Sequence, residues 1–314
     1  MDINYLLFLQ NFRNSIHDAW TPFMEWISHF AVAYLLIIPT FIYWCMDKKK
    51  GLYTLASASV SIAVNATLKL TACIYRPWIR DARVVPAGDA ITEATGYSFP
   101  SGHTTTATPL YGGIAVSYGK KKKWIALICI LLILVTGFSR NYLGVHTPQD
   151  VGVGLLIGSA SLYFMYKLFR HLEAHPEKEN IWLLAGLIFS IAAIIYISVK
   201  PYPMEYADGK LLVDPQRMMR DGFKDIGMLG AFCISRFLEK SFIRFRAPGF
   251  NVKGILISAA GVVPLFLITK LLPNPLTSLF GSHFGAMISQ AVLIFFIIFL
   301  WPAVIRLLTG AKEA

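Results

Sequence analysis

The sequence predicts an all-α fold, a polytopic bundle of transmembrane helices. Hydrophobic residues make up 55% of its 314 residues and charged residues only 15%, and the mean hydropathy is +0.55. Soluble domains of this length are considerably more polar. The apolar residues also form runs long enough to cross a hydrocarbon core of about 30 Å. These observations indicate an integral membrane protein.

The first segment, residues 1–20, is predicted to be an amphipathic helix lying in the membrane interface. Its apolar side chains recur at helical spacing and are opposed by polar ones. Because the segment is too polar to span a bilayer, its apolar face is expected to rest on the lipid. No cleavable signal peptide is expected here, since a basic region followed by a small-residue cleavage site is not evident.

Nine apolar runs then form candidate membrane spans. They divide into a core at residues 21–199 and a C-terminal extension at residues 200–314. The seventh run contains Asp225 and Arg236, which makes it the weakest candidate. The predicted spans are Thr21–Met46, Leu52–Ile74, Thr104–Tyr118, Trp124–Phe138, Pro148–Phe169, Ile181–Val199, Asp221–Phe237, Ile255–Leu272 and Phe284–Leu308.

Basic residues predict the orientation of the bundle. The net charge of +11 is not interpreted as nucleic-acid binding, because the lysines form short clusters beside apolar runs, as they do in cytoplasmic loops. If the helices alternate, sixteen lysines and arginines fall on one side and twelve on the other. The richer side, with Lys48–Lys50 and Lys120–Lys123, is predicted to be cytoplasmic. The N-terminus and the three polar stretches described next then face the extracytoplasmic side.

The first polar stretch ends the second apolar run with Lys69, Arg76 and Pro77. A spacing of seven predicts that Lys69 and Arg76 share one helical face, two turns apart, before Pro77 ends the helix. A lysine this deep in an apolar run is a candidate functional residue. The alternative is that both side chains extend to lipid headgroups.

The second stretch is Pro100-Ser101-Gly102-His103, directly before the third run. A proline and two small residues at a helix start present unpaired backbone N–H groups, which bind anions. His103 would then lie within reach of the bound anion. The alternative is an ordinary Ser/Gly helix start with a solvated histidine.

The third stretch runs from Ser139 to Asp150, between two of the most apolar segments. Thr147 can cap the helix that Pro148 begins. His146 and Asp150 are four residues apart, so the carboxylate can accept a hydrogen bond from one ring nitrogen and leave the other with a lone pair. Arg140 adds a planar guanidinium suited to phosphate oxygens.

Together the three stretches supply three cations, a helix-start anion site, two histidines and a carboxylate on one side of a membrane. A phosphoryl oxyanion fits this set, with one histidine attacking and the other acting as general acid. No metal or cofactor is needed, because the cations already balance the charge. The residues therefore predict phosphoryl transfer through a phosphohistidine.

In residue types, spacing and order, these stretches resemble the three-part motif of the type 2 phosphatidic acid phosphatase family. That family belongs to a superfamily that also contains soluble vanadium haloperoxidases. The resemblance implies that His146 is the nucleophile, His103 protonates the leaving oxygen, and Asp150 orients His146. It also implies a helical core of six helices, here followed by about three more, and a metal-independent reaction. The residues that would hold the phosphate are Lys69, Arg76, Ser101, Gly102 and Arg140.

The outer N-terminus and the nine spans are similar to the glucose-6-phosphatase branch of this superfamily. The expected protein is thus a membrane phosphatase acting on a phosphate monoester or the terminal phosphate of a lipid, such as phosphatidate, phosphatidylglycerophosphate or a polyprenyl diphosphate. A soluble sugar phosphate as substrate, a lipid phosphotransferase and an anion transporter remain alternatives. Residues 80–93 are predicted to form a substrate rim and residues 200–220 a connector. Neither the substrate nor the oligomeric state follows from the sequence.

Overall fold

The computed structural model describes residues 2–33, 36–207 and 209–310 and is almost entirely helical. Six helical segments in this described part are long and apolar enough to cross a membrane. They are Lys48–Arg80, Lys123–Tyr142, Pro148–Ala174, Pro176–Val199, Val252–Leu271 and Pro273–Thr309. The all-α, polytopic fold predicted from composition is therefore confirmed.

Helix α4 (Lys48–Ala72) is the central helix of the bundle. It packs against α7 (Gly102–Tyr118), α9 (Pro148–Ala174) and α11 (Pro215–Leu238). Small side chains make this close packing possible, because Ser57, Ala58, Ser59 and Ala63 are all fully buried. Helix α8 (Lys123–Tyr142) packs beside α7, and α10 (Glu179–Val199) beside α11.

The predicted span Thr21–Met46 is wrong as a single transmembrane helix. Helix α2 (Thr21–Ala33) lies crosswise to the bundle, and a separate short helix, α3 (Ile37–Phe41), continues as a π-helical turn (Ile42–Met46) to the start of α4. Residues 34–35, inside the predicted span, lie outside the described residues. The physical reason is that α2 carries Glu25 and Ser28, whose polar side chains bind the loops and α8 rather than lipid.

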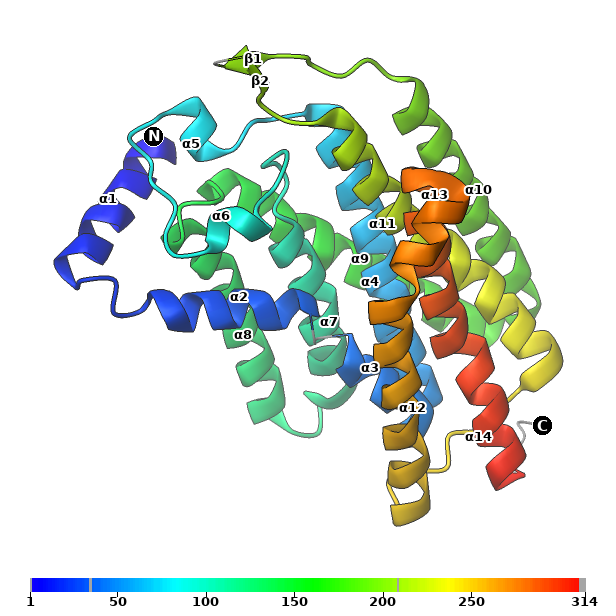
Figure 1. Cartoon of the computed structure of the whole chain (residues 1–314). Helices are drawn as coiled ribbons and strands as arrows, with labels where there is room; N and C mark the ends of the chain where they lie inside the picture. Colours follow the sequence, from blue (N-terminus) through cyan, green and yellow to red (C-terminus); the bar gives the residue numbers. More distant parts are fainter. Residues whose placement is uncertain (1, 34–35, 208, 311–314) are drawn as a thin grey trace.

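The N-terminal helix α1 spans Asp2–Ser15, shorter than the predicted segment 1–20, because residues 16–20 form turns. Figure 1 shows it beside α5 (Pro77–Arg80) and the loops at one end of the bundle. Buried Arg13 attaches it there, donating to the carbonyls of Val85 at 2.9 Å and Tyr142 at 3.4 Å. The helix is thus fastened to the loops; its position in the membrane interface stays a prediction.

The C-terminal third shares its core with α4. One apolar cluster joins Tyr43 and Leu52 to Met228 of α11 and to Leu265 and Ile294 further along the chain. Helix α11, the weakest candidate span, lies between α4, α10 and α13, and its Arg236 pairs with Glu179 of α10. Further elements are the short helix α6 (Ala90–Glu93), the hairpin β1 (Tyr206–Ala207) and β2 (Lys210–Leu211), α12 (Val252–Leu271), α13 (Pro273–Phe295, with a kink at Gly281) and α14 (Trp301–Thr309).

A buried charge network ties α4 to the end of α11. The Glu239 carboxylate is fully buried and accepts from Lys48 Nζ at 2.8 Å and from the Phe245 backbone N–H at 3.1 Å. Arg236 also donates to Glu239, and its Nε lies 2.8 Å from Glu179 of α10. Each charge is therefore compensated by an opposite one inside the protein.

Replacing Glu239 with glutamine is expected to destabilise the fold by roughly 3–5 kcal/mol, because buried Lys48 loses its carboxylate partner and Arg236 loses one of two. A thermal melt of the detergent-purified protein measures the loss as a lower melting temperature. Glu177→Gln is the matched control, because Glu177 is 64% exposed and should stay within about 0.5 kcal/mol of the wild type. An unchanged melting temperature for Glu239→Gln would mean that this network does not support the fold.

Candidate active site

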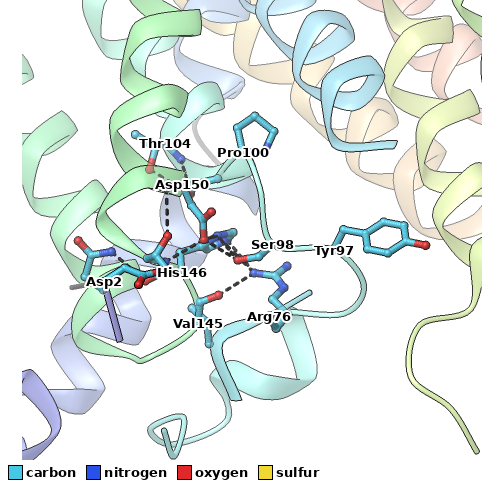
Figure 2. Close-up of polar contacts among 12 residues, drawn as sticks. Asp2, Arg76, Tyr97, Ser98, Pro100, Thr104, Val145, His146 and Asp150 are labelled. Carbon is cyan, nitrogen blue, oxygen red and sulfur yellow. Dashed lines mark hydrogen bonds and ion pairs between the residues drawn. The ribbon is translucent and has the colours of Figure 1, made fainter. Parts of the chain in front are cut away.

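The three polar stretches meet at one end of the bundle (Figure 2). They come from the end of α4 and the loop after it, from the start of α7, and from the turn between α8 and α9. The contact between Arg76 and His146 joins residues 70 positions apart, and the contact between Ser98 and Asp150 joins residues 52 apart. Tertiary packing thus gathers side chains that the sequence keeps separate.

His146 is the central residue of the site and is 1% exposed. Its Nδ1 lies 3.3 Å from Asp150 Oδ2, and its Nε2 lies 2.8 Å from Arg76 Nη1. The Asp150 carboxylate accepts from Nδ1, so Nδ1 carries the ring proton and Nε2 keeps its lone pair. Arg76 Nη1 also lies 3.5 Å from Nδ1, so the guanidinium lies against the ring beside both nitrogens and places a cation next to the unprotonated Nε2.

Asp150 is held by three donors that converge on Oδ2. Besides His146, these are the Ser98 hydroxyl at 2.5 Å and the Thr147 backbone N–H at 2.8 Å. The Thr147 hydroxyl accepts in return from the Asp150 N–H at 3.3 Å, which forms a capping box at the start of α9, with Pro148 at the first position. The cap predicted at Thr147 is confirmed, and it holds the carboxylate facing His146.

Ser98 is a site residue that the sequence reasoning missed. It is fully buried, and its hydroxyl lies 3.4 Å from His146 Nδ1 as well as bonding to Asp150. It lies in a loop without periodic pattern, two residues before Pro100. The only feature of the sequence that could have pointed to Ser98 was its position next to the second polar stretch.

Arg76 reaches the site by a route other than the predicted one. Helix α4 ends at Ala72, and Cys73 adopts the left-handed conformation with φ 49°, so Arg76 does not share a helical face with Lys69. The loop carries Arg76 back instead, and its guanidinium donates to the carbonyls of Val145 at 2.9 Å and Gly96 at 3.2 Å. These bonds orient the group that caps His146.

Lys69 supports the loop that precedes α7. Its ammonium donates to the carbonyls of Pro100 at 2.6 Å, Ser98 at 3.2 Å and Tyr97 at 3.3 Å. In this structure Lys69 therefore holds the backbone that leads into the second stretch.

Ser101 and Gly102 begin α7 as predicted. The Ser101 side chain caps the helix by accepting from Thr104, and its backbone N–H donates to the Asp150 carbonyl at 2.9 Å. A side chain at Gly102 would meet no atom within 4 Å, so open space lies in front of the first turn, where helix N–H groups attract anions. His103 follows in the same turn, and Arg140, His146, Arg76 and Lys69 all act on it electrostatically.

Arg140, in the last turn of α8, is 1% exposed and donates to the Ser28 hydroxyl of α2. It also lines a cavity of about 300 Å³ between α2 and the loop that carries Asp89. Ser28 is a second contact that the sequence reasoning missed, because α2 was assigned to a membrane span.

Burial and the neighbouring charges keep His146 neutral. Burial lowers the pKa of His146 well below its ordinary value, and the charges of Arg76, Lys69 and Arg140 lower it further. A neutral imidazole with a directed lone pair can attack an electrophile at neutral pH. No group of three or more metal-ligating side chains occurs among the residues that the structure describes.

Comparison with known proteins agrees with the motif. Residues 50–173 match the PAP2 superfamily. An undecaprenyl-diphosphatase of Bacillus subtilis is 31% identical over 165 residues, which cover 51% of this chain and 78% of the relative. Phosphatidylglycerophosphatase B of the same species is 33% identical over 115 residues, 34% of this chain and 55% of the relative.

The catalytic subunit of bovine glucose-6-phosphatase is 25% identical over 215 residues, 60% of this chain and 58% of the relative. This chain thus spans little more than half the length of phosphatidylglycerophosphatase B and of the glucose-6-phosphatase subunit. No solved structure matches the chain.

Proposed function

Because this chain belongs to the PAP2 superfamily, we propose that it is an integral membrane phosphatase that hydrolyses a phosphate monoester or the terminal phosphate of a lipid. The observation that carries the proposal is the His146 ring, with Nδ1 on Asp150 and Nε2 on Arg76. An imidazole held in this way supplies a nucleophile already paired with a phosphate-binding cation.

In the first step, His146 Nε2 attacks phosphorus and the bond to the leaving oxygen breaks. His103 gives its proton to that oxygen, so the leaving group departs as an alcohol, or as a phosphate when the substrate is a diphosphate. Arg76 turns from Nε2 to the phosphoryl oxygens, where Arg140 and the first turn of α7 add further stabilisation. Asp150 compensates the positive charge that develops on the ring of His146.

In the second step, water attacks the phosphohistidine from the side that the leaving group vacated. The neutral His103 takes a proton from the water, and the nitrogen–phosphorus bond breaks to release inorganic phosphate. His146 returns to its starting state and His103 is protonated again. Three cations and the helix N-terminus carry the charge of the transition state, so the reaction proceeds without a metal ion in this proposal.

A lipid substrate is supported by the membrane fold and by relatives named for lipid phosphates, including a lipid A 4'-phosphatase of Bacteroides thetaiotaomicron. Lipid can approach sideways between helices while its headgroup reaches the site. Transfer of the phosphate to an acceptor other than water would use the same first step. An anion transporter would need the cations but not the lone pair of His146.

Phosphate release by the purified protein tests the activity directly. Release is expected from lipid or soluble phosphate esters, to persist in excess chelator and to be inhibited by vanadate, which occupies a phosphoryl site. Uptake of phosphate into vesicles without any hydrolysis would favour the transporter and contradict the proposal.

The site is proposed to face the extracytoplasmic side, together with the N-terminus. This orientation is supported by the basic clusters Lys48–Lys50 and Lys120–Lys123, because clusters of lysine mark the cytoplasmic side of a membrane protein. Both clusters lie where α4 and α8 begin, at the ends of these helices away from the site. Labelling of single cysteines by an impermeant thiol reagent in intact cells tests this, in a variant without the four native cysteines. Labelling near Lys121 but not near Asp89 would reverse the orientation.

The activity should be highest at acidic pH, because attack requires a neutral His146 and a protonated His103, and burial and the neighbouring cations lower the pKa of both histidines. As the pH falls, kcat/KM should decline only below about 6.5, the ordinary histidine value. Lys69→Gln removes a cation, so the pKa of His146 rises and the acidic limb moves to higher pH. The ionisation of the substrate is common to both proteins and cancels in the comparison. An acidic limb that stays in place would show that Lys69 does not act on His146.

A further inference from the structure

A short loop, residues 95–98, holds Arg76 in place beside His146 (Figure 2). The Gly96 carbonyl accepts from Arg76 Nε at 3.2 Å, and the Thr95 carbonyl accepts from Nη2 at 3.4 Å. Arg76 is only 5% exposed, so its guanidinium has little freedom to find other partners. A shift of this loop would therefore move the cation relative to the ring nitrogen that attacks phosphorus.

Met218, near the start of α11, lies directly against this loop. Its Sδ accepts from the Tyr97 N–H at 3.2 Å. Gly96 has a φ of 80°, and a Cβ at that position would overlap the same sulfur. Met218 is 7% exposed and shares an apolar cluster with Tyr97 and Leu70. One side chain thus contacts both residues at the centre of the loop.

Helix α11 gives Met218 a fixed position. The helix begins with an N-cap, Asp214, whose side chain accepts from the Gln216 N–H at 2.9 Å, and with Pro215 at the first helical position. Further along, the helix packs between α4, α10 and α13. All of α11 lies beyond residues 50–173, which match the superfamily. The C-terminal extension therefore supplies a contact to the loop that the three-part motif does not include.

A cavity beside this contact gives the loop room to move. It has a volume of about 250 Å³, and Arg76, Gly96 and Met218 are among the residues that line it. A thioether sulfur is a weak acceptor, so Met218 holds the loop chiefly by filling space. Neighbouring atoms partly relax into the space that a shortened buried side chain leaves. Here those neighbours are the loop backbone and the guanidinium that it holds.

We propose that Met218 is a positioning residue for phosphoryl transfer. By packing on Gly96 and Tyr97, it keeps the loop carbonyls in place. Those carbonyls in turn hold the Arg76 guanidinium beside His146. The C-terminal extension thus takes part in catalysis without touching the substrate. This inference rests on the proposed phosphatase function and adds a residue to its site.

Met218→Ala should weaken inhibition by vanadate, which occupies the phosphoryl site that Arg76 binds. The inhibition constant is expected to rise about tenfold or more, and kcat/KM for phosphate release to fall by up to about 10²-fold, because small displacements of positioned groups are costly. An inactive fraction of the protein lowers kcat but leaves the inhibition constant unchanged. That constant therefore reports on the site and not on partial unfolding. Met218→Leu, which keeps the volume, should stay close to the wild type.

Met287→Ala is the matched control. Met287 of α13 packs on Gly227, further along α11, so its truncation should lower the melting temperature and leave the inhibition constant as in the wild type. A second background isolates the route through Arg76. Arg76→Lys keeps the charge but lacks the planar group that bonds to the loop carbonyls. Met218→Ala should therefore change the inhibition constant much less in that background.

If Met218→Ala does not fold, Met218→Val retains part of the packing and should give an inhibition constant between those of alanine and the wild type. A wild-type inhibition constant in a folded Met218→Ala or Met218→Val protein would overturn the role of Met218. So would an equal rise in Met287→Ala, or an equal fold-change with and without Arg76→Lys. Absence of phosphate release by the wild type from every substrate would instead contradict the phosphatase function, and the role of Met218 would fall with it.

Discussion

Replacing His146 with alanine is expected to abolish phosphate release, with kcat reduced on the order of 10⁴-fold or more. The ring supplies the attacking Nε2, and no other side chain in the described site combines a lone pair with contacts to both a carboxylate and a guanidinium. Removal of a nucleophile in comparable enzymes has effects of this size, the residual rate arising from transition-state stabilisation by the remaining groups. Phosphate release under single-turnover conditions measures the loss.

A covalent intermediate gives this prediction a second readout. Wild-type protein quenched during turnover of a radiolabelled substrate should carry a phosphate that survives base and is released by acid, as expected of phosphohistidine, and His146→Ala should carry none. His171→Ala is the matched control, because His171 is exposed at the opposite end of α9, and it should react as the wild type does. Substantial hydrolysis by His146→Ala would exclude the phosphohistidine mechanism.

Asp150→Asn is expected to reduce kcat by about 10³- to 10⁴-fold while the protein remains folded. The carboxylate fixes the tautomer of His146 by accepting from Nδ1, and it compensates the charge that the ring acquires during attack. An amide can present N–H to the ring, in which case the lone pair sits on Nδ1 and Nε2 is protonated. The same substitution in a serine protease triad reduces kcat by about 10⁴-fold for this reason.

Thr147→Ala separates catalysis from helix capping. The substitution removes the Thr147 hydroxyl that accepts from the Asp150 N–H, which should lower the free energy of unfolding by about 1 kcal/mol. The Asp150 carboxylate keeps its contacts with Ser98 and His146. Thermal melts should therefore show Thr147→Ala at least as destabilised as Asp150→Asn, with a far smaller loss of kcat. Equal losses of kcat in the two variants would show that Asp150 acts through the helix start and not on His146.

Local chemistry made part of the site predictable. Thr147 and Asp150 form a capping box around Pro148 at the start of α9, and such short-range rules act wherever a helix begins. Ser101 caps α7 in the same way. These elements depend on neighbours in sequence, so the pattern of residue types was sufficient to place them.

Other features depended on contacts between distant segments. The seven-residue spacing predicted one helical face for Lys69 and Arg76, but α4 stops at Ala72, where Cys73 turns left-handed. From a distant segment, Lys200 Nζ donates to the Leu70 carbonyl and to Cys73 Sγ at this helix end. Hydrophobicity alone likewise predicted one span over 21–46, where α2 instead turns its polar residues to the loops and α8. The hydrophobic pattern of a segment shows which of its residues are polar. It does not show which groups elsewhere in the protein form hydrogen bonds with those residues.

By itself the sequence determined the helical membrane architecture and identified the three polar stretches, because these depend on composition, capping and residue type; the chemistry assigned to those stretches is a prediction. Only the tertiary structure decided that Arg76 caps His146 Nε2, that Ser98 joins Asp150, and that α2 lies across the site and contacts Arg140. Those contacts bridge between 52 and 112 positions of sequence. They arise from how helices pack in three dimensions, which no local pattern encodes.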